Sequence, residues 1–127
     1  GLFAVEYFLT EHELLVNEIA PRVHNVGHLT IEASNVSQFE QHVRAVMGME
    51  MPNVTVKPAV MDNLLYEDEI AEACRAELGV DLPGATVHWY GKSQPRPLRK
   101  MGHLTAVSQS VEAAATLANQ SMDKLRS

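Results

Sequence analysis

Two glutamates near the start of the chain are the first candidates for chemistry. Glu6 and Glu18 lie in two segments rich in apolar, β-branched and aromatic residues, 2–9 and 14–19, with a short polar stretch between them. If these segments form a β-hairpin with a three-residue loop at 11–13, the two carboxylates lie directly opposite each other on one face. Such a pair is repulsive unless a shared proton, a basic partner or a divalent cation compensates it. Mg²⁺ commonly takes one or two carboxylates together with phosphate oxygens, so the pair suits magnesium.

This interpretation depends on the strand register. The same hairpin pairs Phe8 with Val16 and Thr10 with Leu14. In another register one glutamate is merely exposed at the surface. Both faces of both strands are largely apolar, so we expect the hairpin to be buried on two sides.

A polar loop follows the second glutamate. It contains Arg22, His24 and Asn25, and it begins so soon after Glu18 that we expect it to lie beside the carboxylate pair. Arginine offers a planar fork of donors to an oxyanion, histidine can shuttle a proton, and asparagine can fix an orientation. The alternative is a purely structural loop, and the spacing of His24 and His28 indicates zinc only weakly.

A basic segment lies later in the chain. Four of the ten Lys and Arg residues fall between positions 92 and 100, among them Lys92, Arg99 and Lys100, and no acidic residue interrupts them. In an acidic chain such a cluster is a plausible site for a phosphate or carboxylate group. The alternative is a solvent-exposed turn.

The segments that position these residues mix strand and helix patterns, which predicts an α+β fold. Ser37 begins a capping-box pattern for a helix that ends at Gly48, and residues 51–53 are the best linker candidate. We therefore expect two domains, 1–51 and 52–127. Further strands are expected at 54–65, 85–91 and 100–108, an acidic helix at 67–78, and a last helix at 111–124 capped by Ser110.

Composition limits the function. The 127 residues carry 16 acidic against 10 Lys and Arg side chains, a net charge of −6, which argues against general binding to nucleic acid or to an anionic membrane. No apolar run is long enough to span a bilayer. Cys74 is the one cysteine, which excludes an internal disulfide, and an intracellular location is the default. Because the chain begins inside an apolar run, we expect it to be a piece of a longer protein.

Three segments resemble one enzyme family. Residues 17–28, Asn-Glu-Ile-Ala-Pro-Arg-Val-His-Asn-Val-Gly-His, are similar to the metal and substrate loop of N5-carboxyaminoimidazole ribonucleotide synthase, an ATP-grasp enzyme of purine biosynthesis. Residues 37–46 resemble the helix that follows this loop. Residues 90–92, Tyr-Gly-Lys, and 99–103, Arg-Lys-Met-Gly-His, resemble the family's carboxyl-terminal signature.

The resemblance implies a fold for each part of the chain. Residues 1–51 would be the end of an ATP-grasp domain, with antiparallel strands and a helix. Residues 52–127 would be the small, β-rich carboxyl-terminal lobe with its helices. The chain would then be a carboxyl-terminal fragment of a cytoplasmic enzyme that usually forms homodimers.

The resemblance also implies a reaction and a role for each candidate residue. The family joins ATP, bicarbonate and aminoimidazole ribonucleotide, through carboxyphosphate, to give the N5-carboxyamino product, ADP and phosphate. Alternation along a regular strand places Asn17 on the face opposite Glu18, so a shared role for these two needs a bulge or a strong twist. By position, Glu6 and Glu18 resemble Mg²⁺ ligands, and Asn17 and Glu18 resemble residues of the nucleotide-metal site. The groups around bicarbonate and carboxyphosphate correspond to Arg22, His24 and Asn25. The ligands of the ribonucleotide phosphate correspond to Lys92, Arg99 and Lys100.

The chain departs from the family pattern at three positions. Val23, Val26 and Leu98 stand where the family usually has Pro, Ser and Gly. Valine at position 26 would remove a polar contact to substrate, and leucine at position 98 leaves the path of the basic loop open, since Gly tolerates φ > 0 and Leu does not. The chain also has no Gly-rich phosphate loop and no lysine ahead of Glu6. We therefore expect these residues not to catalyse the reaction without the amino-terminal part of the enzyme.

Two alternatives remain open. One is a different ATP-grasp carboxylase or ligase, such as a formate-dependent ribonucleotide transformylase, which substrate dependence would distinguish. The other is a non-catalytic lobe for oligomerisation or ligand binding. The joint presence of Glu6, Glu18 and Arg22 argues for an enzyme.

Overall fold

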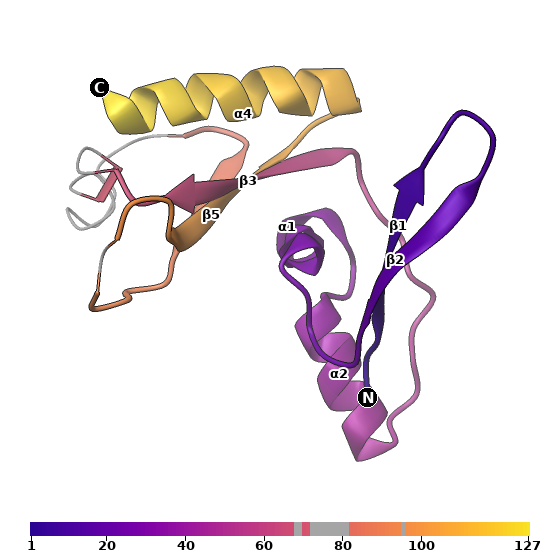
Figure 1. The fold of residues 1–127 in the computed structure, drawn as a ribbon. Coiled ribbons are helices and arrows are strands. Elements are labelled where there is room, and N and C mark those ends of the chain that lie inside the picture. Colours follow the sequence, from indigo (N-terminus) through magenta and orange to yellow (C-terminus); the bar gives the residue numbers. More distant parts are fainter. Residues whose placement is uncertain (68–69, 72–81, 95) are drawn as a thin grey trace. The chain divides into compact units, whose positions relative to one another are not determined.

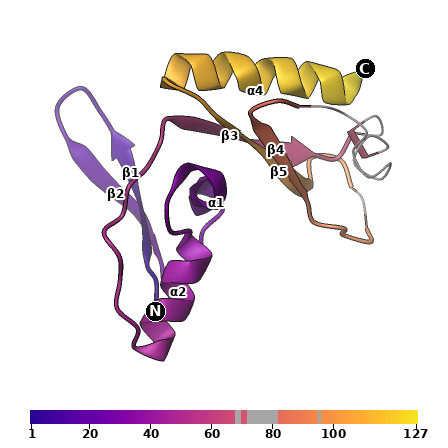
Figure 2. The same ribbon diagram turned by 180° about the vertical axis from the view of Figure 1, so that it is seen from behind.

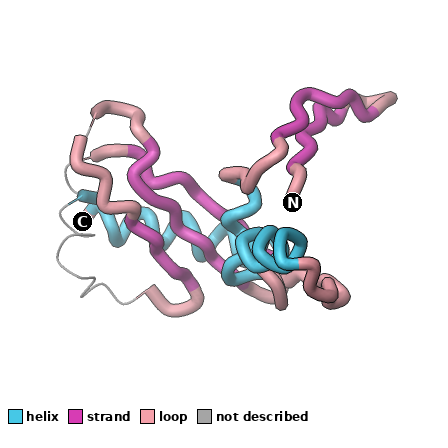
Figure 3. Tube along the Cα trace, turned by 90° about the horizontal axis from the view of Figure 1, so that it is seen from below, coloured by secondary structure: helices cyan, strands magenta, loops and turns pink. Residues whose placement is uncertain are grey.

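The computed structural model describes all residues except 68–69, 72–81 and 95, and it consists of two compact units, Gly1–Val56 and Lys57–Ser127 (Figure 1). Each unit combines strands with helices, which confirms the α+β class (Figure 3). Within the described part of the chain, no helix has the length and apolar character needed to cross a bilayer.

The expected acidic helix at 67–78 falls largely outside the described residues, and Cys74 with it. Three of its residues are described, Glu67, Ile70 and Ala71, and the last two are buried.

The first unit begins with the predicted β-hairpin. β1 (Ala4–Leu9) pairs antiparallel with β2 (Leu14–Ala20). In the turn between them, the Thr10 hydroxyl accepts hydrogen bonds from the amides of His12 at 3.3 Å and Glu13 at 3.0 Å. Most hairpin side chains are exposed, so the expected burial on two sides is wrong for this chain.

A β-bulge sets the register of the hairpin. Glu6 lies opposite Glu18, as predicted, and the register shifts immediately after Glu6. Asn17 is the extra residue on β2. A bulge bends its strand and redirects a side chain. Asn17 can therefore lie beside the carboxylates, which the regular alternation of a strand would not allow.

The predicted pairs nearer the turn are wrong. Phe8 lies opposite Leu15 rather than Val16, and Leu14 faces the last residue of β1 rather than Thr10. The turn therefore holds one residue more than expected.

The polar loop after β2 contains more helix than the sequence pattern predicts. A 3-10 helix, η1 (Val26–Leu29), leads into the short helix α1 (Thr30–Ala33).

The next helix begins and ends as predicted. α2 (Gln38–Met47) is capped by Ser37, whose hydroxyl accepts from the Glu40 amide, and it stops at Gly48 in the left-handed conformation. Its apolar stripe is exposed in this chain, although such a stripe normally faces a core: Phe39, Val43, Val46, Met47.

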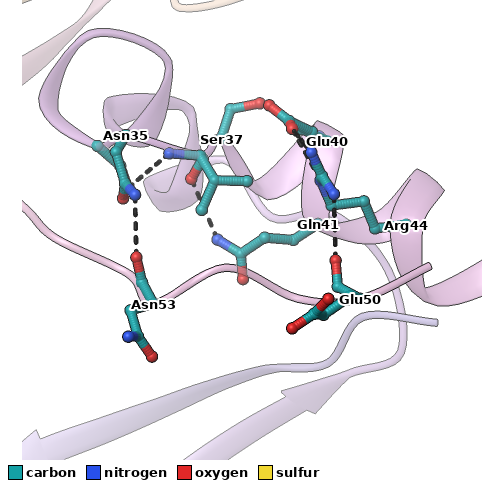
Figure 4. A network of polar contacts seen from close by, with 9 residues as sticks. Asn35, Ser37, Glu40, Gln41, Arg44, Glu50 and Asn53 are labelled. Atoms are coloured by element: carbon teal, nitrogen blue, oxygen red, sulfur yellow. Dashed lines mark hydrogen bonds and ion pairs between the residues drawn. The ribbon is translucent and has the colours of Figure 1, made fainter.

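Polar contacts hold the segment after α2 to the first unit (Figure 4). Arg44 donates to the Glu40 carboxylate at 2.8 Å and to the Glu50 carbonyl at 3.1 Å. The Asn35 amide donates to the Asn53 carbonyl at 2.9 Å. The first unit therefore extends to Val56, while the domain boundary after residue 51 stays a prediction.

The second unit is built on a three-stranded antiparallel sheet (Figures 1 and 2). The strands are β3 (Ala59–Leu65), β4 (Ala85–Trp89) and β5 (Lys100–Val107), and β5 is central. β3 is an edge strand and begins directly after Pro58, a residue type that sheets accept mainly at edges or bulges.

The last helix covers one face of this sheet (Figure 2). α4 (Val111–Arg126) is capped by Ser110, whose hydroxyl accepts from the Ala113 amide at 3.2 Å. At its other end Arg126 donates two hydrogen bonds to the Glu67 carboxylate, which lower the pKa of Glu67 below its usual value. Between sheet and helix lies an apolar core whose members include Leu64, Ile70, Leu104, Ala118 and Leu125.

Candidate functional site

An open cleft of about 560 Å³ in the first unit contains part of the predicted site. Glu6, Asn17 and His24 line it. Asn17 Nδ2 donates to Glu6 Oε2 at 3.1 Å, and His24 Nε2 lies 3.1 Å from Glu6 Oε1. Each oxygen of the Glu6 carboxylate therefore has a polar partner, and the carboxylate is held at the cleft.

The second carboxylate of the pair has its own basic partner. Arg22 lies 3.9 Å from the Glu18 carboxylate, and its guanidinium also donates to the Val23 carbonyl at 3.1 Å. Both Glu18 and Arg22 are exposed, so this ion pair contributes less than about 1 kcal/mol to stability. The two opposed carboxylates thus persist because each has a compensating neighbour. Glu18, Arg22 and Asn25 lie outside the residues that line the cleft.

The donor atoms at this end of the hairpin are of the kind that magnesium prefers. Glu6 and Glu18 offer carboxylate oxygens, and Asn17 offers an amide oxygen because its nitrogen is directed to Glu6. Mg²⁺ prefers oxygen ligands and keeps several waters, which a half-exposed site allows.

The loop that carries His24 is held by a buried side chain, that of Gln38 at the start of α2. Gln38 Oε1 accepts from the His24 amide at 2.9 Å, and Gln38 Nε2 donates to the His24 carbonyl at 2.8 Å. A larger residue in place of Gly27 would displace the Gln38 side chain, since a Cβ there would lie 2.3 Å from Gln38 Oε1. Asn25 lies half-buried in the same loop, and its carbonyl accepts from the His28 amide at 3.1 Å.

The basic segment lies in the second unit and closes on itself. Lys92 Nζ donates to the Lys100 carbonyl at 2.5 Å and lies 5.1 Å from the centre of the Tyr90 ring. Arg99 donates to the Gln94 carbonyl. The segment therefore brings Lys92 next to Lys100, and main-chain carbonyls accept from two of the three predicted phosphate ligands.

Next to this segment is a cluster of aromatic rings. The Tyr90 hydroxyl lies 2.7 Å from Nδ1 of His103, which is buried on β5, and the His103 ring stacks on His88 at 4.7 Å. Burial raises the pKa of the Tyr90 phenol above its usual value.

Leu98 adopts the backbone conformation that favours glycine, with φ 62°. The main chain thus keeps the positive φ expected of a family member with Gly here, at a cost of about 1–2 kcal/mol for an L residue. The leucine side chain is 79% exposed, so packing does not offset this strain.

Leu98→Asn is therefore expected to stabilise the chain by about 0.5–1 kcal/mol, because Asn tolerates positive φ without the chain entropy of Gly. Chemical denaturation of the whole chain measures the change. Leu98→Ala is the matched control, since it removes the exposed side chain but keeps the strain. An equal gain from Ala would show that strain at this position is not the cause.

Sequence reasoning missed Gln38 and Thr30 as residues that organise the site. The main-chain N–H of Gln38 donates to the Thr30 hydroxyl at 2.8 Å, and this hydroxyl donates to the Gly27 carbonyl at 2.6 Å. A polar residue in the first turn of a helix is ordinarily exposed, so the pattern gave no signal that Gln38 is 5% exposed.

Comparison with known proteins finds two family models in succession. Residues 1–39 match the ATP-grasp domain, and residues 59–117 match the phosphoribosylaminoimidazole carboxylase C-terminal domain. The chain therefore joins part of an ATP-grasp domain to a domain of the carboxylase C-terminal type.

Relatives identify the family. The chain is 40% identical to the N5-carboxyaminoimidazole ribonucleotide synthase of Saccharolobus solfataricus, over 98% of this chain and 32% of that protein. It is 46% identical to the chloroplastic phosphoribosylaminoimidazole carboxylase of Vigna aconitifolia, over 89% of this chain and 22% of that protein. The N5-carboxyaminoimidazole synthase of Aspergillus clavatus, solved with ADP and 5-aminoimidazole ribonucleotide, has a TM-score of 0.83 and 34% identity, over 97% of this chain and 34% of that one.

The chain belongs to the N5-carboxyaminoimidazole ribonucleotide synthase family of ATP-grasp proteins. It spans between about a fifth and a third of the length of these relatives.

Proposed function

We propose that this chain supplies the carboxyl-terminal part of an ATP-dependent ligase that carboxylates 5-aminoimidazole ribonucleotide with bicarbonate in purine biosynthesis. The observation that carries the proposal is the group formed by Glu6, Asn17 and His24, opposite Glu18, in a chain that matches the two family models in order. The complete enzyme would include the amino-terminal part of the ATP-grasp domain.

In this enzyme Glu6, Asn17 and Glu18 would hold Mg²⁺ beside the phosphates of ATP. When bound, the ion would neutralise negative charge on the phosphoryl group that is transferred. The hydrogen bond from Asn17 and the contact with His24 keep the Glu6 carboxylate in place before the nucleotide binds.

Arg22, His24 and Asn25 would act on bicarbonate. One bicarbonate oxygen attacks the γ-phosphorus of ATP, ADP leaves, and carboxyphosphate forms. The amine of the ribonucleotide then attacks the carbonyl carbon, and phosphate leaves. The guanidinium of Arg22 is weakly engaged at 3.9 Å from Glu18, so it can turn to stabilise the developing negative charge.

Lys92, Arg99 and Lys100 would bind the phosphate of the ribonucleotide. Phosphate oxygens would replace the carbonyls that Lys92 and Arg99 contact in this structure. Arginine and lysine bind phosphate through charge-assisted hydrogen bonds, which are stronger than those to neutral carbonyls. The enzyme would be a cytoplasmic homodimer, without a nucleic acid or membrane partner.

Substrate dependence of ATP hydrolysis by the complete enzyme tests this function. We expect hydrolysis to require both the ribonucleotide and bicarbonate. Hydrolysis that formate supports and bicarbonate does not would assign the protein to the formate-dependent transformylases instead. The 127-residue chain alone is the control, and robust turnover by it would contradict the proposed division of the site.

A further inference from the structure

The side chain of Gln38 makes contacts that fix the direction of its amide. The His24 main-chain N–H can only donate, so the Gln38 atom 2.9 Å away is the oxygen. The His24 main-chain carbonyl can only accept, so the atom 2.8 Å from it is the nitrogen. Two main-chain groups of one residue therefore determine which way a buried side-chain amide points, which geometry alone usually leaves open.

The same nitrogen lies 2.7 Å from Nδ1 of His28. An amide nitrogen donates and does not accept, so Nδ1 of His28 must be the acceptor. In a neutral imidazole only one nitrogen carries a proton. The proton of His28 is therefore on Nε2.

We infer that Gln38 is the positioning residue of this site, which fixes the main chain of His24 and holds His28 as the neutral tautomer protonated at Nε2. His24 in turn contacts Glu6, so the chain of contacts runs from the start of α2 to the carboxylate. The inference rests on the proposed function for the importance of that carboxylate, whereas the hydrogen-bond assignment stands without it.

Two further contacts keep this arrangement rigid. The main-chain N–H of Gln38 donates to the Thr30 hydroxyl, which in turn donates to the Gly27 carbonyl and so orders the turn there. The His28 ring packs against Phe39, the next residue on α2, with ring centres 5.2 Å apart. His28 is thus held by α2 at its face and at Nδ1. With the ring proton on Nε2, that nitrogen can donate a hydrogen bond but cannot accept a proton.

Nitrogen NMR of the imidazole rings in the ¹⁵N-labelled 127-residue chain tests the inference without substrate or metal. We expect Nδ1 of His28 to resonate as an unprotonated nitrogen and Nε2 as a protonated one. A protonated Nδ1 in the unmodified chain would overturn the inference by itself, whatever any variant does.

Gln38→Glu supplies the matching change. A carboxylate has no proton to donate, so we expect His28 to become protonated at Nδ1 and the His24 carbonyl to lose its side-chain donor. The control is Gln41→Glu, the same substitution on the same helix, where the amide donates to the Val36 carbonyl instead; it should leave the His28 signals in place. Unchanged His28 signals in folded Gln38→Glu would contradict the inference. Either result is independent of bicarbonate-dependent ATP hydrolysis, which tests the proposed function.

Discussion

Replacing Glu6 with Gln is expected to lower ribonucleotide-dependent ATP hydrolysis by the complete enzyme at least about a hundredfold. The substitution keeps the shape of the side chain and removes its negative charge. Glutamine can offer one neutral oxygen to Mg²⁺, and its NH₂ group would face either Asn17 Nδ2 or His24 Nε2, which are the present partners of the two carboxylate oxygens. Both the metal ligand and the geometry of the cleft are therefore affected.

The matched control is Glu11→Gln. Glu11 lies in the exposed turn of the same hairpin, so its substitution makes the same change in net charge away from the site. Adding Glu18→Gln to Glu6→Gln should abolish the remaining Mg-ATP turnover. Undiminished activity in the double variant would contradict a metal-binding role for the two glutamates and would favour a non-catalytic, ligand-binding role for this part of the chain.

Replacing Gly102 with Ala is expected to destabilise the second unit by about 3 kcal/mol. Gly102 lies on the central strand β5, opposite Trp89 of β4. A Cβ at this position would lie 2.4 Å from the His88 carbonyl oxygen and 3.2 Å from the Trp89 Cα. Because the obstacle is main chain, the two strands would have to separate, and the core that packs against this sheet would lose part of its packing.

Gly91→Ala distinguishes this steric effect from the general cost of replacing glycine. Gly91 has φ 62°, but an added Cβ would meet no atom within 4 Å. Its substitution should therefore cost only the strain of the left-handed conformation, about 1 kcal/mol. Urea denaturation of the whole chain measures both variants. If Gly102→Ala costs no more than Gly91→Ala, the close approach of β4 to β5 is not what requires glycine.

Much of the fold could be predicted because local signals are strong. Ser37 and Ser110 start their helices, Gly48 ends one, and Pro58 lies next to an edge strand, each for a reason that depends on a few neighbouring residues. Exposure of the hairpin and of the α2 stripe could not be predicted in this way. An apolar pattern indicates that a surface is suited to burial, but it does not show what covers it.

The register of the hairpin shows how a local prediction can be right at one place and wrong at another. Glu6 and Glu18 face each other as expected, although the turn is one residue longer than expected. The bulge at Asn17 offsets that extra residue. The residue types around Asn17 do not predict a bulge. Its local consequence is the hydrogen bond from Asn17 to Glu6.

The role of Gln38 depends on contacts between distant parts of the sequence. Its amide meets the main chain of His24, fourteen residues earlier. Spacing rules describe neighbours on one helix or across one strand pair, so they do not predict such a contact.

The fate of a bicarbonate oxygen tests the central claim most directly. The complete enzyme is supplied with ¹⁸O-labelled bicarbonate, ATP and aminoimidazole ribonucleotide, and the released phosphate is analysed by mass spectrometry. If bicarbonate attacks the γ-phosphorus, the bridging oxygen stays with phosphorus when the carbon–oxygen bond breaks, so each phosphate carries one labelled oxygen. Phosphate without label, formed at the same rate as product, would contradict the account.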